Sequence, residues 1–211
     1  MTVNLIWDFD GTLVQSSEAI RQALRLLYQT YQLPFDEAWV MDTIIQESIG
    51  QLLKRLAEAH QLDFSELLAF FTREQEARDH LIALMPTAKE TLALTSQQGV
   101  KHFIVTHKGK TTQAVLQRLG IADYFTEVIT AACGFKRKPN PEALLFLIDK
   151  YQMAKAKTYY IGDRPLDLAA ARAAGICSIN LLLPDSDDNH HISQLSDIVE
   201  LFSGKNSSSN Q

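Results

Sequence analysis

The sequence predicts an α/β protein with a doubly wound parallel sheet and an inserted all-helical domain. After Pro86, short apolar runs alternate with segments of helical periodicity, and the connections between them are short. This alternation is typical of a mainly parallel sheet that helices cover on both faces. From about Ser16 to Leu84, by contrast, every periodic segment is helical and none has the pattern of a strand. One apolar run precedes this helical block, and the simplest arrangement places it in the same sheet.

These changes in pattern divide the chain into three predicted parts. Residues 1–14 and 85–203 form the α/β core, and residues 15–84 form the helical insertion. Residues 204–211, GKNSSSNQ, are polar and low in complexity, so we expect a disordered tail there.

The first strand is predicted in VNLIW, Val3–Trp7, a short apolar run that ends near Asp8 with turn residues close behind it. The helical block follows, and Pro34 interrupts it. Apolar residues at helical spacing indicate its helices. They are Ile20, Leu24, Leu27, Tyr28 and Tyr31 in a first set, Ile45, Ile49, Leu52, Leu53 and Leu56 in a second, and Phe64, Leu67, Leu68, Phe71 and Leu81 in a third.

Caps and glycines mark the helices of the second half. Thr87–Glu90, TAKE, has the pattern of a capping box and begins a helix that Gly99 can end. Asn140 is a predicted N-cap, with Pro141 at the first position of its helix. The predicted strands are KHFIVT, EVIT, TYYIGD and ICSIN, and the remaining predicted helices are TTQAVLQRLG, NPEALLFLIDKY and RPLDLAAARAAG.

Composition limits the classes of function. The chain has 211 residues, a formal net charge of −5 and no long basic stripe, which argues against a nucleic-acid polymer as partner. No apolar segment approaches the roughly 18 residues that a membrane span needs. Asp8 and Asp10 interrupt the only early apolar run, so we expect no signal peptide. Cys133 and Cys177 form neither a CxxC pair nor a metal-type cluster. We expect a cytoplasmic monomer, with a dimer as the alternative.

Polar residues gather at the carboxyl ends of the predicted strands, where open α/β sheets bind their ligands. Two acids one residue apart, as after the first strand, repel each other if their side chains converge, so a positive partner is expected between them. The candidate residues are Asp8, Asp10, Thr106, Lys136–Lys138, Asp163 and Asp167.

The motifs DFDGTL, FIVTHK, KRKPNPEAL and GDRPLD, in this order, resemble the four motifs of the haloacid dehalogenase (HAD) superfamily. The helical insertion after the first motif resembles the C1-type cap of that family. The resemblance covers nearly the whole chain apart from the tail, and is strongest to the phosphoglycolate phosphatase and β-phosphoglucomutase branch. It implies a Rossmann-like core with a helical cap and a Mg²⁺-dependent phosphatase. The implied substrate is a small phosphomonoester such as phosphoglycolate, a sugar phosphate or a nucleotide monophosphate.

The resemblance also implies the catalytic and metal-binding residues. Asp8 attacks phosphorus and forms an aspartyl-phosphate. Asp10 is the general acid and base, and its backbone carbonyl joins Asp8 and Asp163 in holding Mg²⁺. Thr106 and Lys138 contact the phosphoryl group, to which Lys138 offers a compact positive charge.

Four further residues are expected around this centre. Gly11 and Thr12 turn the chain so that backbone N–H groups approach the phosphoryl oxygens. His107 is a candidate substrate contact. Asp167 lies four residues after Asp163 and orients Lys138 or a metal-bound water.

The substrate is not readable from the sequence. Many relatives carry an acid where this chain has Gln15, at the entry to the cap, and specificity is expected near this residue and in the cap loop from Gln46 to Gly50.

A β-phosphoglucomutase-type phosphomutase shares every core motif and is the main alternative. A dehalogenase is a weaker alternative, because it needs neither Mg²⁺ nor an acid at the position of Asp10, and this chain has both Asp10 and Asp163. A phosphonate hydrolase is also a weaker alternative. It would use a cap lysine, and Lys54, the only lysine in the helical block, has the pattern of a solvated helix face. A non-catalytic binding protein usually loses one of the four motif residues that are present here.

Overall fold

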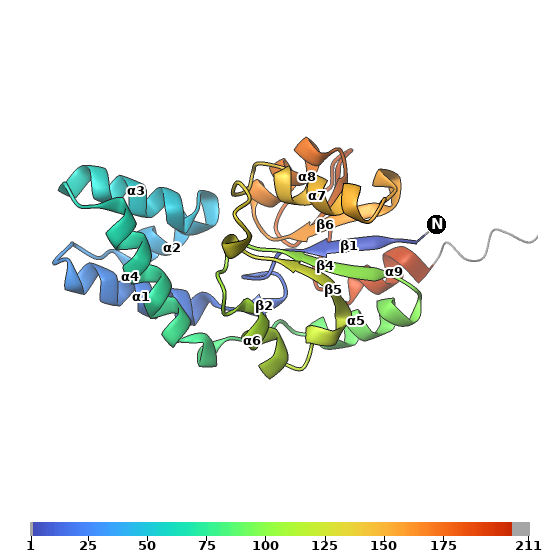
Figure 1. Ribbon diagram of the computed structural model, residues 1–211, viewed down its shortest axis with the longest axis horizontal. Coiled ribbons are helices and arrows are strands. Elements are labelled where there is room, and N and C mark those ends of the chain that lie inside the picture. Colours follow the sequence, from blue (N-terminus) through green and yellow to red (C-terminus); the bar gives the residue numbers. More distant parts are fainter. Residues whose placement is uncertain (1, 204–211) are drawn as a thin grey trace, which may run out of the picture. The chain divides into compact units, whose positions relative to one another are not determined.

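The computed structural model describes residues 2–203, which form two compact units (Figure 1). One unit contains Met1–Gln15 and Ala83–Gln211, and the other contains Ser16–Ile82. The tail at 204–211, predicted to be disordered, lies outside the described residues.

The first unit contains a six-stranded parallel sheet with the strand order β5-β4-β1-β6-β7-β8. β1 therefore lies in the middle of the sheet although it comes first in the chain, and the predicted fold class is confirmed. The strands of this sheet are β1 (Asn4–Trp7), β4 (Lys101–Val105), β5 (Phe125–Ile129), β6 (Thr158–Gly162), β7 (Cys177–Asn180) and β8 (Asn189–His191).

Helices cover both faces of this sheet (Figure 1). The face that carries Ile6, Phe103 and Tyr160 packs against α7 and α8 in one apolar cluster. α5 and α9 lie together on the opposite face. The helices of this unit are α5 (Ala88–Gln97), α6 (Thr112–Arg118), α7 (Glu142–Lys150), α8 (Pro165–Ala174) and α9 (Asp197–Ser203), with short 3₁₀ turns at Ala122–Tyr124, Ala131–Cys133 and Lys155–Lys157.

Three short strands and one helix were not predicted. β2 (Val14–Gln15) and β3 (Ala83–Leu84) form a two-residue antiparallel pair, and β3 lies at the end of the stretch in which we expected no strand. β8 is polar, Asn-His-His, and therefore lacks an apolar pattern. α9 is only seven residues long. The three strands have only two or three residues each, which is too short for periodicity to reveal them.

Two predicted helix caps differ from the structure. Thr87 has a φ of 62°, in the left-handed region, and its side chain makes no capping hydrogen bond, so the predicted capping box is wrong. Asn140 does accept a hydrogen bond from the Glu142 backbone at 3.1 Å, but Pro141 stands before the helix rather than at its first position.

The second unit is built from helices that enclose an apolar core. Its helices are packed around buried leucines and around Tyr28 and Phe71. Side chains of Asp36, Ser48 and Asp63 cap three of the helices by accepting backbone N–H bonds. The helices are α1 (Ser17–Thr30), α2 (Glu37–Gln46), α3 (Ile49–His60) and α4 (Phe64–Ala77), followed by a 3₁₀ turn at Asp79–Leu81.

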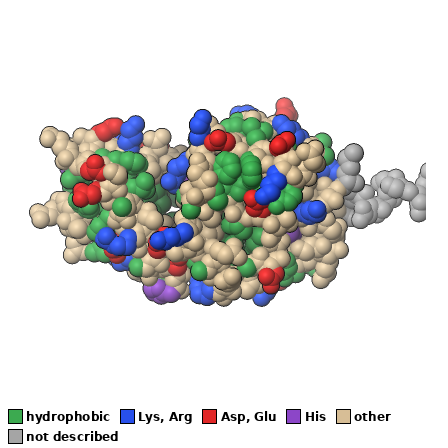
Figure 2. Space-filling view, viewed as in Figure 1, with side chains coloured by type: hydrophobic (Ala, Val, Ile, Leu, Met, Phe, Trp, Pro, Cys, Tyr) green, Lys and Arg blue, Asp and Glu red, His purple; other side chains and the backbone are tan. Residues whose placement is uncertain are grey.

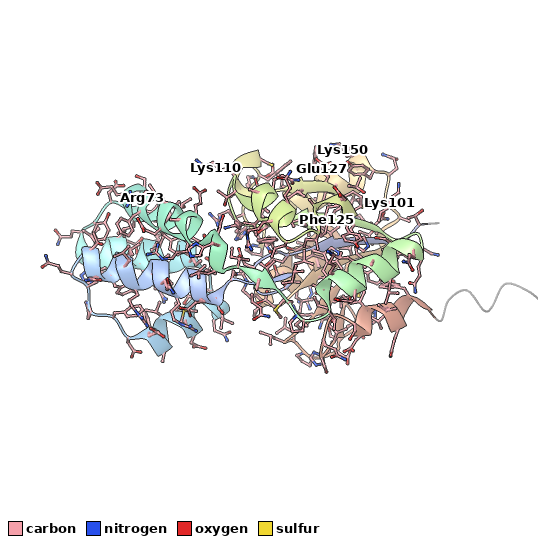
Figure 3. All side chains as sticks on the ribbon, turned by 90° about the horizontal axis from the view of Figure 1, so that it is seen from below. Arg73, Lys101, Lys110, Phe125, Glu127 and Lys150 are labelled. Atoms are coloured by element: carbon pink, nitrogen blue, oxygen red, sulfur yellow. The ribbon has the colours of Figure 1, made fainter. Side chains whose placement is uncertain are left out.

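The surface of the α/β unit carries both signs of charge. Figure 2 shows acidic and basic side chains interspersed over its visible face. Lys150 of α7 and Glu127 of β5 form one exposed pair at 2.8 Å, and Figure 3 shows them beside each other. Exposed pairs of this kind contribute little to stability. Within residues 2–203, none of the helices combines the length and the apolar character that crossing a bilayer requires.

A buried polar chain links β1, β4 and α5. The Trp7 indole donates to His102 Nδ1 at 3.1 Å, and His102 Nε2 lies 3.2 Å from Thr95 Oγ1. Because Nδ1 accepts, the proton of the neutral ring is on Nε2 and points to Thr95, whose hydroxyl donates to the Thr91 carbonyl at 2.5 Å. Burial lowers the pKa of His102 to about 4.

This burial predicts a pH-dependent stability. The unfolded chain takes up a proton at His102 near the ordinary histidine pKa of 6.5, whereas the folded chain does so only near 4, so stability falls as the pH drops between these values. We expect the free energy of unfolding to fall by about 2 kcal/mol more in the wild type than in His102→Gln between about pH 7.5 and pH 5. Urea unfolding at each pH measures this difference. Parallel pH curves for the two proteins would contradict the prediction.

Candidate active site

The carboxyl ends of three adjacent strands bring the predicted residues together. Asp8 follows β1, Thr106 follows β4 and Asp163 follows β6, and the sheet order places β1 between the other two. Lys138 reaches the same point from the loop before α7. These residues are distant in sequence, so the parallel topology alone makes them neighbours.

Asp8 is buried, and both of its carboxylate oxygens are engaged. Oδ1 accepts the Phe9 backbone N–H at 2.7 Å. Oδ2 lies 3.0 Å from Lys138 Nζ and 3.1 Å from Arg164 Nη2. Burial by itself raises the pKa of Asp8, but the positive charges of Lys138 and Arg164 outweigh it, and the pKa lies below 3.8. Asp8 is therefore an ionised carboxylate held between two cations.

Lys138 is the most completely bonded side chain of the site. Its ammonium group lies 3.0 Å from Asp8 and donates to Asp167 Oδ1 at 2.7 Å and to the Tyr160 hydroxyl at 2.6 Å. Tyr160 in turn donates to the Val105 carbonyl at 3.0 Å. An ammonium group has three protons, and here each has a partner. The Lys138 side chain is 2% exposed, so its charge is fixed in position.

Asp167 binds the Lys138 ammonium group with one carboxylate oxygen and a backbone N–H before α8 with the other. Its second oxygen, Oδ2, accepts the Arg164 backbone N–H at 3.1 Å. Burial is the main reason that the pKa of Asp167 is raised, partly offset by the charge of Lys138. Gly162 makes room for this carboxylate, because a Cβ there would lie 2.5 Å from Asp167 Cβ.

Asp163 lies against the loop that follows Asp8. Its Oδ1 accepts a hydrogen bond from the Thr12 hydroxyl at 3.1 Å. Gly11, at φ 82°, allows the close approach, since a Cβ there would lie 2.4 Å from Asp163 Oδ2. Burial, together with the negative charges of Asp8 and Asp167, raises the pKa of Asp163 to about 7. A cation placed here would favour its ionised form.

The backbone N–H groups of Gly11 and Thr12 are used inside the loop. The Gly11 N–H donates to the Val14 carbonyl at 2.9 Å, and the Thr12 N–H lies 3.4 Å from the Phe9 carbonyl. The expected approach of backbone N–H groups to a phosphoryl group at this turn stays a prediction. The observed contacts of Gly11 and Thr12 position Asp163, because a tight turn satisfies its own backbone groups first.

Thr106 and His107 lie beside Lys138. The Thr106 hydroxyl oxygen accepts the Lys108 backbone N–H at 3.1 Å, which leaves its hydroxyl hydrogen to donate. His107 Nε2 accepts the Lys138 backbone N–H at 2.8 Å. Burial, reinforced by the charges of Lys138 and Arg137, lowers the pKa of His107 to about 2. The neutral ring thus holds the lysine loop, and its contact with a substrate stays a prediction.

The residues present fit a divalent cation. Asp8, Asp163 and Asp167 each offer a carboxylate oxygen, and these atoms lie within 4.8 Å of one another. Oxygen-only donors suit Mg²⁺. The half-buried Asp10 follows at the end of the same loop as Asp8. Asp10 is expected to contribute its backbone carbonyl. The distances between the three carboxylates do not test this role.

Two residues of this site escaped the sequence analysis. Arg164 contacts the Asp8 carboxylate, and Tyr160 binds the Lys138 ammonium group. A signal existed for Arg164, since a basic residue inside GDRPLD is flanked by acids that need a counter-charge. Tyr160 gave none, because an aromatic residue within a buried strand is the ordinary pattern.

Comparisons with known proteins agree on the family. The family described as haloacid dehalogenase-like hydrolase matches this chain over residues 5–181. A phosphoglycolate phosphatase from Vibrio vulnificus strain YJ016 is 40% identical over 108 residues, which cover 51% of this chain and 47% of the relative. The chain thus matches about half the length of that relative.

Two longer matches extend the comparison. A phosphoglycolate phosphatase from Rhodospirillum rubrum is 31% identical over 183 residues, covering 82% of this chain and 76% of the relative. The crystal structure of a candidate phosphoglycolate phosphatase from Lactobacillus plantarum superimposes with a TM-score of 0.83 at 25% identity, covering 96% of this chain and all of that one.

Proposed function

The chain belongs to the haloacid dehalogenase-like hydrolase family, and from this premise we propose that it is a Mg²⁺-dependent phosphatase. It hydrolyses a small phosphomonoester through an aspartyl-phosphate intermediate. The observation that carries the proposal is the state of Asp8, a buried and ionised carboxylate at a strand end that two cationic side chains hold in place.

The proposed reaction uses Asp8 as the nucleophile. One carboxylate oxygen attacks phosphorus, the ester oxygen leaves, and Asp10 gives it a proton. In the second step Asp10 takes a proton from water, which attacks the aspartyl-phosphate and frees phosphate. Lys138 stabilises negative charge on the transferred group throughout. The Thr106 hydroxyl donates to one of its oxygens.

The proposed metal site consists of the Asp8 and Asp163 carboxylates and the Asp10 carbonyl. Mg²⁺ bound there supplies charge that lets an anionic nucleophile approach an anionic phosphoryl group. We assign Asp167 to holding Lys138, whose ammonium group donates to Asp167 Oδ1 at 2.7 Å.

Phosphoglycolate is the first substrate to test, because the relatives from Vibrio vulnificus and Rhodospirillum rubrum carry the name phosphoglycolate phosphatase. Sugar phosphates and nucleotide monophosphates follow. A phosphomutase of the β-phosphoglucomutase type uses the same core residues and remains the second candidate. The proposal further places the protein in the cytoplasm as a monomer without a nucleic-acid partner.

The deciding experiment measures phosphate release from a panel of phosphomonoesters with and without Mg²⁺. We expect turnover of at least one member that EDTA abolishes and added Mg²⁺ restores. Isomerisation of a sugar phosphate, followed by NMR in the same reactions, would instead favour the phosphomutase. Phosphate release that is unaffected by removal of the metal would contradict the proposed mechanism.

A further inference from the structure

The positively charged Arg164 side chain lies against two of the carboxylates that are proposed to bind Mg²⁺, Asp8 and Asp163. It stands between Asp163 and the first residue of α8, and its guanidinium group reaches Asp8 Oδ2 at 3.1 Å. Its Nε lies 3.9 Å from Asp163 Oδ1. Carboxylates that are candidate Mg²⁺ ligands therefore already share a positive charge that belongs to the protein.

The charges of the cluster show what this arginine changes. With every carboxyl group ionised, Asp8, Asp163 and Asp167 carry three negative charges against the two positive charges of Lys138 and Arg164. The sum is −1, and a divalent cation makes it +1. Without Arg164 the corresponding sums are −2 and zero. Arg164 therefore makes the charge of the cluster more positive by one unit, whether or not a cation is bound.

We propose that Arg164 sets the balance between cation and anion binding at this site: its guanidinium group weakens the binding of Mg²⁺ and strengthens the binding of a phosphoryl dianion. The proposal rests on the function proposed above, since it presumes that Mg²⁺ and a phosphoryl group bind at Asp8. The two effects have opposite signs, and this opposition distinguishes the proposal from a merely structural ion pair.

The structure favours Arg164 over Lys138 for this role. Lys138 has a partner for each of its protons and is 2% exposed. The Arg164 side chain is 15% exposed, and within the described residues its buried Nε has no hydrogen-bond partner. A guanidinium group has five N–H donors in a fork that suits phosphate oxygens. Arg164 thus retains a donor that its contact with Asp8 does not use, whereas each proton of Lys138 already has a partner.

The test measures two binding constants in Arg164→Gln and in the wild type. Calorimetric titration of EDTA-treated protein gives the Mg²⁺ affinity, and titration with inorganic phosphate at saturating Mg²⁺ gives the anion affinity. We expect Mg²⁺ to bind about tenfold more tightly in the variant, because a repelling charge is gone, and phosphate to bind about tenfold more weakly. Arg164→Lys should bring both constants back toward the wild type.

Two further variants keep the test decisive. Arg164→Ser removes the charge but places a preferred N-cap residue before α8, so it serves if the glutamine variant does not fold. Arg172→Gln removes an exposed arginine from the same helix, which pairs with Asp188, and should change neither constant.

The outcomes separate this proposal from the function on which it rests. Wild-type protein that binds no Mg²⁺ would contradict the proposed function itself. A different result would overturn only the role of Arg164. In that case the wild type binds Mg²⁺ and phosphate, but the Arg164 variants bind both more weakly or show no change in either affinity. Tighter Mg²⁺ binding with weaker phosphate binding in both charge-removing variants supports it.

Discussion

Replacing Asp8 with asparagine should abolish Mg²⁺-dependent phosphate release and lower kcat by at least about 10⁴-fold. The amide has nearly the size of the carboxylate, but its neutral oxygen is a poor nucleophile toward phosphorus. No other carboxylate can take its place easily, since Asp163 is bonded to Thr12 and Asp167 to Lys138. The expected loss is therefore in the chemical step rather than in substrate binding.

The Asp8→Asn variant should still fold. Its side-chain oxygen can accept the Phe9 N–H, as Asp8 Oδ1 does. The variant loses the attraction of Lys138 and Arg164, but it also loses the repulsion that raises the pKa of Asp163. These changes oppose each other, so activity should fall far more than stability.

Steady-state kinetics with the best substrate of the panel measures the effect, and circular dichroism verifies the fold. Asp149→Asn, which changes an exposed acid at the end of α7, is the matched control and should keep full activity. Brief incubation with ³²P-labelled substrate followed by acid quenching should label the wild type in a hydroxylamine-sensitive way and leave Asp8→Asn unlabelled. Activity of Asp8→Asn within tenfold of the wild type would place the nucleophile elsewhere.

The position of the site could be predicted because topology determines it. Short apolar runs separated by helices predict parallel strands, and parallel strands place their carboxyl ends at one edge. That reasoning brings Asp8, Thr106 and Asp163 together from the sequence alone, and the structure places them on adjacent strands. The same reasoning placed the run Lys136–Lys138 near them, but the choice of Lys138 within this run came from its position before the Pro139-Asn140-Pro141 helix start.

The contacts within the site could not be predicted, because they depend on distances of a few ångström. The Gly11 and Thr12 N–H groups close their own loop, which a sequence of turn residues does not reveal. Arg164 folds back onto Asp8 instead of pointing to solvent, and the buried charge there makes that conformation favourable. Thr87 likewise has a φ of 62°, in the left-handed region, which the pattern Thr87–Glu90 does not reveal.

Replacing Lys138 with methionine should produce the largest loss of stability of any single change in the site. The variant leaves Asp8 and Asp167 as buried acids without their shared ammonium group, and it leaves the Tyr160 hydroxyl without a donor. Removing one partner of a buried ion pair costs about 3–5 kcal/mol. For a chain of this size the midpoint of thermal unfolding should fall by about 10 °C.

The loss should depend on pH with a definite sign. Without Lys138 the pKa values of Asp8 and Asp167 rise, because Arg164 is then the main positive charge that opposes the effect of burial. Protonation then removes the buried charges at low pH, so the deficit relative to the wild type should shrink as the pH falls from about 8 to about 5. A deficit caused by lost packing alone would stay constant over this range.

Fluorescence of Trp7 can follow the unfolding of the α/β unit specifically. Trp7, the last residue of β1, is fully buried, while Trp39 lies in the helical unit and is best replaced by phenylalanine in all proteins compared. Lys136→Met removes an exposed lysine from the same loop and is the matched control. A thermal midpoint of Lys138→Met within about 2 °C of that control at pH 8 would show that the Asp8 and Asp167 charges do not depend on this ammonium group. The expected fall at pH 8, with recovery toward pH 5, would show that the Lys138 ammonium group stabilises the folded α/β unit through the charges of Asp8 and Asp167.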